Sequence, residues 1–78
     1  MYQFEISLRS FRQVQDFVAL ALRKHFDIFV GNERQRINGK DLLGMFSLDY
    51  TRSLQVSATC SEEEFLTFRQ EVEALTRI

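Results

Sequence analysis

The chain has 78 residues, of which 45% are hydrophobic and eight are Phe, with no Pro. A chain of this length buries only about 60% of its unfolded surface, so we expect a single domain over residues 1–78 with an efficient core. Ten Lys+Arg balance eleven Asp+Glu, and the net charge of −1 gives no general attraction to nucleic acid or anionic membranes. One His and one Cys cannot form a zinc cluster or an internal disulfide, so we expect no metal and no cofactor.

The N-terminus and the apolar runs bear on where the protein acts. No apolar run reaches the roughly 20 residues that a membrane-spanning helix needs. The segment Met1–Glu5 lacks the basic and apolar regions of a signal peptide. We therefore expect a cytoplasmic protein that makes no membrane contact.

The first two predicted elements are a strand and a helix. From Tyr2 to Leu8 apolar and polar residues alternate, which indicates a half-buried strand. Ser10 stands at an N-cap position, and Gln13 three residues later fits a capping box. The helix should then end near Lys24-His25. Its apolar face is spaced by three and four residues and consists of Phe11, Val14, Phe17, Val18, Ala21 and Leu22.

Two short strands and two turns should follow. Ile28–Val30 is a β-prone run, and Gly31-Asn32 after it favours a turn. The polar segment Glu33–Ile37 then fits an outer strand paired to the previous one. Asn38-Gly39 is a second turn signal.

The remaining elements are a helix, a strand and a helix. Lys40–Leu48 is apolar on nearly all sides, which indicates a short helix with part of its apolar surface exposed. Leu54–Cys60 alternates as a strand. Ser61 and Glu64 form a second capping box at the start of the last helix. Its predicted inner face consists of Phe65, Phe68, Val72 and Leu75.

The resulting order is βαββαβα, an α+β arrangement. Helices in this pattern must cover one face of an antiparallel sheet. We expect an open-faced sandwich, with a four-stranded antiparallel sheet, three helices on one face and polar side chains on the other.

This order, together with the segment from Asn38 to Leu48, resembles the HPr phosphocarrier family of the bacterial sugar phosphotransferase system. In that family the segment reads roughly N-x-K-S-[IL]-[ML]-G-[VM]-[MF]-S-L, and the resemblance covers nearly the whole chain. The matching positions are Asn38, Lys40, Gly44, Ser47 and Leu48.

The junction between the first strand and helix departs from the family. HPr carries phosphate on a histidine in a G-[LI]-H-[TA]-R-P motif. Here the junction is several residues shorter, Ser10 takes the place of the histidine, Gln13 that of the proline, and only Arg12 matches. The sole histidine, His25, lies at the far end of the helix, more than about 20 Å away. The resemblance therefore does not carry the family's phosphotransfer reaction to this chain.

Asp41 is the second departure. In some HPr proteins this position is a serine that a kinase phosphorylates, and the modified form acts with a transcription factor. Asp41 supplies a fixed negative charge, a partial mimic of phosphoserine. An acid at a helix N-terminus is equally explained as an N-cap or first-turn residue.

The apolar residues of the second helix allow two readings. Leu43, Met45 and Phe46 correspond to a partner-binding patch in HPr, or they are ordinary core residues. Arg12 is either an anion-binding residue at the first helix or an ordinary surface arginine.

These residues support three hypotheses. The favoured one is a regulatory or protein-binding module without phosphotransfer, linked to sugar transport or catabolite regulation. Its partner would be a phosphotransferase-system component, a kinase or a transcriptional regulator. The alternatives are a structural domain that self-associates as a homodimer and a divergent phosphocarrier that uses His25 or Ser10.

Overall fold

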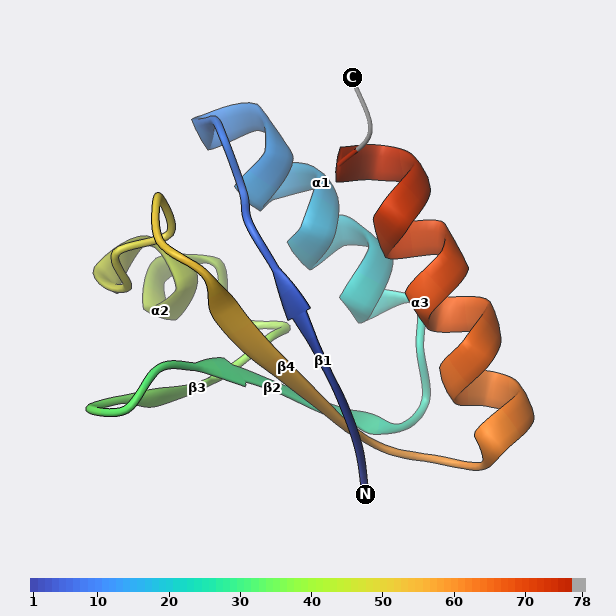
Figure 1. The fold of residues 1–78 in the computed structure, drawn as a ribbon. Helices are drawn as coiled ribbons and strands as arrows, with labels where there is room; N and C mark the ends of the chain where they lie inside the picture. The colour runs from blue at the N-terminus through green and yellow to red at the C-terminus, as the bar shows by residue number, and fades with distance from the viewer. Residues whose placement is uncertain (77–78) are drawn as a thin grey trace.

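The computed structural model describes residues 1–76. Its strands are β1 (Tyr2–Ile6), β2 (Asp27–Gly31), β3 (Arg36–Asn38) and β4 (Leu54–Thr59). Its helices are α1 (Phe11–Leu22), α2 (Leu42–Ser47) and α3 (Glu62–Thr76). The sheet is antiparallel with strand order β1-β4-β2-β3, and the helices cover one of its faces (Figure 1). The predicted α+β open-faced sandwich with order βαββαβα is confirmed.

The register of β4 explains the division between the two faces of the sheet. Ser57 lies opposite Gln3 of β1 and opposite Phe29 of β2, so these three residues share the outer face. This face is polar, as predicted, except at half-buried Phe29. The guanidinium of Arg36 lies 4.4 Å from the centre of the Phe29 ring and covers it.

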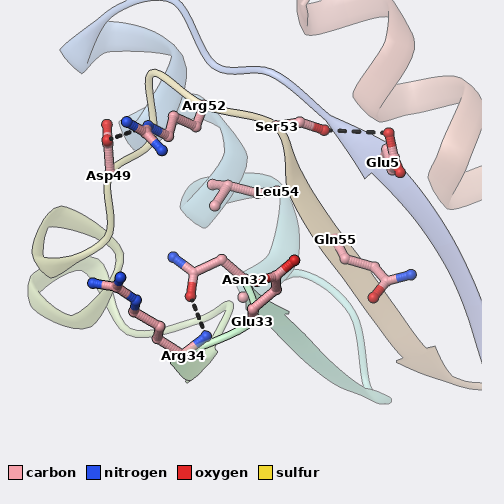
Figure 2. A pocket seen from close by; sticks show the side chains of 10 residues that line it. Glu5, Asn32, Glu33, Arg34, Asp49, Arg52, Ser53, Leu54 and Gln55 are labelled. Atoms are coloured by element: carbon pink, nitrogen blue, oxygen red, sulfur yellow. Dashed lines mark hydrogen bonds and ion pairs between the residues drawn. The ribbon is translucent and has the colours of Figure 1, made fainter.

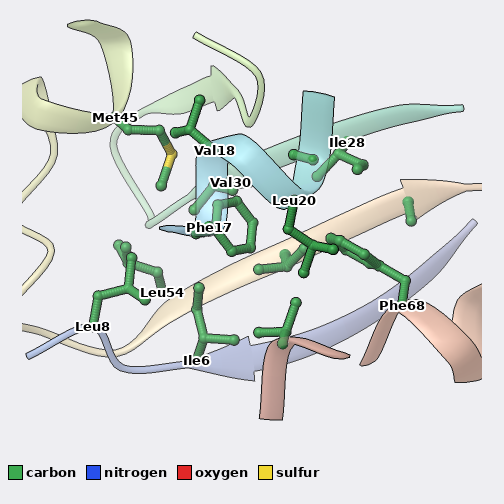
Figure 3. Close-up of a cluster of buried hydrophobic side chains, with 14 of the residues drawn as sticks. Ile6, Leu8, Phe17, Val18, Leu20, Ile28, Val30, Met45, Leu54 and Phe68 are labelled. Carbon is green, nitrogen blue, oxygen red and sulfur yellow. The ribbon is translucent and has the colours of Figure 1, made fainter. Parts of the chain in front are cut away.

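The core lies between the inner face of the sheet and the helices (Figure 3). Phe17 of α1 and Phe68 of α3 are fully buried, and their ring centres are 6.1 Å apart. Burial of such a side chain stabilises the fold by about 1.5–3 kcal/mol. The two long helices are therefore fixed to the sheet mainly by aromatic and aliphatic packing.

Both predicted capping boxes exist, but only one has the full pattern. At α3 the Ser61 Oγ accepts from the Glu64 N–H at 3.2 Å, and Glu64 Oε1 accepts from the Ser61 N–H at 3.1 Å. At α1 the Ser10 Oγ accepts from the Gln13 N–H at 3.2 Å. Gln13 Oε1 reaches one residue further back and accepts from the Arg9 N–H at 2.7 Å. The Gln13 side chain therefore fixes the chain that enters α1.

The prediction of a strand over Glu33–Ile37 was wrong in extent. The Asn32 Oδ1 accepts from the N–H groups of Arg34 and Gln35, at 2.8 and 3.0 Å. This side chain holds the turn as far as Gln35, so β3 begins only at Arg36. The other boundaries differ from the predictions by at most about three residues, as at α1, which ends at Leu22 and not near Lys24-His25.

The first and last residues of the predicted apolar face of α1 are not core residues. Phe11 is 55% exposed and Leu22 is 61% exposed, whereas Leu20, outside the predicted face, is buried. Both exposed residues lie at the ends of the helix, beyond the part that the sheet covers. The stripe is therefore buried only in its middle.

Within residues 1–76 no helix is long and apolar enough to cross a membrane.

Candidate functional site

The N-terminal end of α1 contacts α2 through a pair of aromatic rings. Phe11 and Phe46 stack with their ring centres 4.5 Å apart and an angle of 11° between the planes. Phe11 was predicted to lie on the apolar inner face of α1, and its contact with Phe46 was not predicted. Phe11 directly follows the N-cap Ser10. This position indicates a residue outside the core, because the first turn of α1 lies where the helix has not yet reached the sheet.

The apolar residues of α2 divide between the core and the surface. Leu43 is 80% exposed, Phe46 is half-buried, and Met45 is fully buried against Val18 and its neighbours (Figure 3). Residues two apart in an α-helix are rotated by about 200°, so Leu43 and Met45 point in opposite directions. Of the two readings left open for Met45, the core residue is the correct one, and its assignment to the partner-binding patch is wrong because its side chain is not exposed.

Arg12 follows Phe11 in α1, and Asp41 directly precedes α2. The Arg12 side chain is 82% exposed, and its Nε is 3.4 Å from Asp16 Oδ1 one turn along α1. Asp41 is the N-cap of α2, where its Oδ1 accepts from the Gly44 N–H at 3.2 Å. We call the surface formed by Phe11, Arg12, Asp41, Leu43 and Phe46 the α1–α2 face.

Ser10 and His25 lie at opposite ends of α1. The Ser10 hydroxyl serves as the helix cap. His25 follows the other end, and its Nε2 lies 3.0 Å from Glu64 Oε2 at the start of α3. His25 is the one histidine of the sequence, so the α1–α2 face holds no imidazole.

Shifted pKa values at Glu64, Asp49 and Cys60 have local causes. The hydrogen bond from the Ser61 backbone lowers the pKa of Glu64, and the Thr51 hydroxyl lowers the pKa of Asp49. Burial raises the pKa of the Cys60 thiol. These shifts are explained by caps, turns and packing, and they do not mark a catalytic group.

A cleft opens between the β2–β3 turn and the loop from α2 to β4 (Figure 2). Two interactions link residues of its lining: Arg52 Nε lies 3.2 Å from Asp49 Oδ2, and the Ser53 hydroxyl donates to Glu5 Oε2 at 3.2 Å. Its lining contains neither His nor Cys. In the described part of the chain, no three His, Cys, Asp or Glu side chains are grouped so that they could hold a metal ion.

Comparison with solved structures shows which known fold this open-faced sandwich has. The crystal structure of HPr-C-His from Thermoanaerobacter tengcongensis matches with a TM-score of 0.76 and 22% identity. The phosphocarrier protein HPr from Bacillus anthracis str. Ames matches with a TM-score of 0.75 and 22% identity. In both cases 97% of this chain and 96% of the other are covered. The chain therefore has the HPr fold, as the sequence resemblance implied.

Comparison of the sequence with protein-family models finds no match, and comparison with curated proteins finds none either.

Proposed function

We propose that this chain is an HPr-like regulatory module that binds a partner protein through the α1–α2 face and does not carry phosphate. The observation that carries the proposal is the exposure of Leu43 (80%) and Phe11 (55%), which are linked through Phe46: Phe11 stacks on its ring, and Leu43 lies one turn away from it on α2. Exposed apolar side chains that gather on one face and have polar neighbours are typical of an interaction site. Arg12 and Asp41 would supply the polar rim of this site.

The partner follows from the resemblance to HPr. HPr proteins bind other components of the phosphotransferase system, and regulated HPr proteins also bind a kinase and a transcription factor. The equivalent surface in those proteins includes the second helix. We therefore propose a phosphotransferase-system component, a kinase or a transcriptional regulator as the partner, with a role in sugar-responsive regulation.

The chemistry of phosphate relay argues against a working phosphocarrier. A relay needs a labile phosphoryl group such as phosphohistidine, and a serine phosphate is too stable to be passed on. Ser10, which takes the place of the family's histidine, already accepts the Gln13 N–H. His25 is paired with Glu64 beyond the other end of α1.

Asp41 fits both a structural and a regulatory role. Its Oδ1 caps α2, while the residue remains exposed and carries its charge at the edge of the α1–α2 face. A partner that prefers the phosphorylated form of HPr would meet a permanent negative charge here, smaller than that of phosphoserine.

A binding titration tests the docking proposal. Purified enzyme I, HPr kinase, transporter component and sugar-responsive regulator from the same organism would each be added to isotopically labelled chain and followed by NMR. We expect shifts at Phe11, Leu43 and Phe46 with one of them. Leu43→Asp should weaken that binding at least about tenfold, since it places a charge in an apolar contact.

The matched control is Leu66→Asp on α3, where Leu66 is 48% exposed. This change should leave binding unaltered. Failure of all four candidate partners to bind, or equal losses in the two variants, would contradict the proposal.

A separate assay tests the phosphocarrier alternative. The chain would be incubated with enzyme I and phosphoenolpyruvate, with an authentic HPr as the positive control. We expect no acid-labile phosphate on this chain, and its detection would overturn the exclusion of phosphotransfer.

A further inference from the structure

The charges around the α1–α2 face differ from one side to the other. On the α1 side Arg9 and Arg12 are exposed, next to the free N–H groups that give a helix start its partial positive charge. On the α2 side Asp41 is exposed at the start of the helix, whereas Asp49, beyond its other end, is paired with Arg52 at 3.2 Å. The stacked Phe11 and Phe46 join the two sides. The face is therefore basic on one side, apolar in the middle and acidic on the other.

Two nearby groups leave this pattern largely intact. Lys40 precedes α2, but its Nζ donates to the Lys24 carbonyl at 2.8 Å and points back toward the end of α1. Asp16 contacts Arg12 at 3.4 Å, with both side chains well exposed. An exposed pair of this kind is weak, so Arg12 can exchange it for another carboxylate.

A twofold interface requires a surface that is complementary to itself. Rotation of the α1–α2 face onto a copy sets apolar residues against apolar residues and the basic side against the acidic side. We propose that a second copy of this chain binds the α1–α2 face as a twofold dimer, with Arg12 of one copy facing Asp41 of the other and Leu43 packed near Phe11. The dimer would cover the surface that the proposed partner uses.

The size of the face sets the strength of the dimer. Three apolar side chains per copy make an interface at the small, transient end of the range, for which we expect a Kd of about 0.1–1 mM. Self-association would then occur only where the chain is concentrated. Its effect on partner binding rests on the proposed function, whereas dimerisation itself does not.

Sedimentation equilibrium and NMR dilution test the dimer. From about 10 µM to about 2 mM the average mass should rise from monomer toward dimer, and the concentration-dependent shifts should centre on Phe11, Leu43 and Phe46. A monomer across the whole range would overturn the proposal. Shifts centred on the edge strand β1 would overturn it too, because they would show a different interface.

Variants then test the contacts. Leu43→Asp should weaken the dimer at least about tenfold, whereas Leu66→Asp on α3 should leave it unchanged. Arg12→Gln and Asp41→Asn should each weaken it about two- to fivefold, and the double variant should be no weaker than the worse single one. Asn keeps the cap of α2, so a loss in Asp41→Asn reports the charge. Additive losses in the double variant would contradict the Arg12–Asp41 contact.

The two proposals fail in different ways. Partner titrations run on dilute chain, where it is monomeric, measure docking alone. A chain that binds its partner but stays monomeric at high concentration retains the proposed function and loses this inference. A chain that dimerises through the α1–α2 face but binds none of the candidate partners loses the proposed function only.

Discussion

The two ends of α1 are held by different kinds of contact. Just beyond its C-terminal end, Lys24 Nζ lies 2.6 Å from Glu71 Oε1 of α3, and His25 Nε2 lies 3.0 Å from Glu64 Oε2. These pairs tie the segment after α1 to α3 with directional polar contacts.

At the N-terminal end the contact is apolar and half open to water. Phe11 stacks on Phe46, and Leu43 projects beside them with little cover. Contacts of this kind can be shared with another molecule, because they lose no hydrogen bond when a new surface arrives. The C-terminal end of α1 is thus tied to the rest of the fold, whereas the N-terminal end is available for binding. The sole histidine, His25, lies at the C-terminal end.

The largest effect should come from the buried residue of α2. Met45→Ala should lower the free energy of unfolding by about 2–5 kcal/mol, because it leaves a cavity under the α1–α2 face. Leu43→Ala, two residues away but 80% exposed, should change it by less than about 0.5 kcal/mol. Urea denaturation measures both. Equal losses would mean that Leu43 is part of the core and that the face is not open.

The next largest effect should come from the helix caps. Ser10→Ala and Ser61→Ala should each cost about 0.5–2 kcal/mol, since each leaves a backbone N–H at a helix start without its acceptor. Ser10→Asn and Ser61→Asn serve as controls that keep the cap. A loss at Ser61 without one at Ser10 would show that the Gln13–Arg9 contact is sufficient to hold the start of α1.

A smaller effect is expected for the pair at the other end of the helix. A double-mutant cycle with Lys24→Met and Glu71→Gln should give a coupling of about 0.5–1 kcal/mol in chemical denaturation. The value exceeds that of most surface pairs because the Lys24 side chain is only 20% exposed. A coupling near zero at low salt would contradict the view that polar contacts fix this end.

The smallest effect concerns pH. The pKa of Glu64 is lowered, first by the Ser61 backbone hydrogen bond, so the stabilisation is present above its usual value of 4.5 and is lost as the pH falls through the lowered value. Glu64→Gln keeps a side chain that can accept the Ser61 N–H but does not titrate. Between about pH 5 and pH 3 the melting temperature of the variant should therefore fall less steeply than that of the natural chain. Parallel declines would contradict the assignment.

Sequence periodicity was sufficient to predict the order of elements, because the alternation in β1 and β4 and the stripe in the middle of α1 each have one dominant period. It failed where side chains bind the backbone locally. The Asn32 turn, which delays β3 to Arg36, depends on a side-chain oxygen that no hydrophobic pattern records.

The candidate site was harder to predict than the fold. In α2 nearly every residue is apolar, so the sequence alone does not say that Met45 is buried and Leu43 exposed. The direction of the helix against the sheet decides it. Phe11 was missed for the same reason, since its partner Phe46 lies 35 positions along the chain and only the tertiary fold brings the two together.

The position of β4 in the sheet has a consequence for biosynthesis. β4 lies between β1 and β2, and the Gln55 side chain donates to Gln3, 52 residues earlier in the sequence. A nascent chain therefore cannot complete its sheet until the segment Leu54–Thr59 has left the ribosome. Pairings between such distant segments form late and slow the search for the native topology. We expect β1, whose only strand partner in the described sheet is β4, to stay unpaired until Leu54–Thr59 has been made.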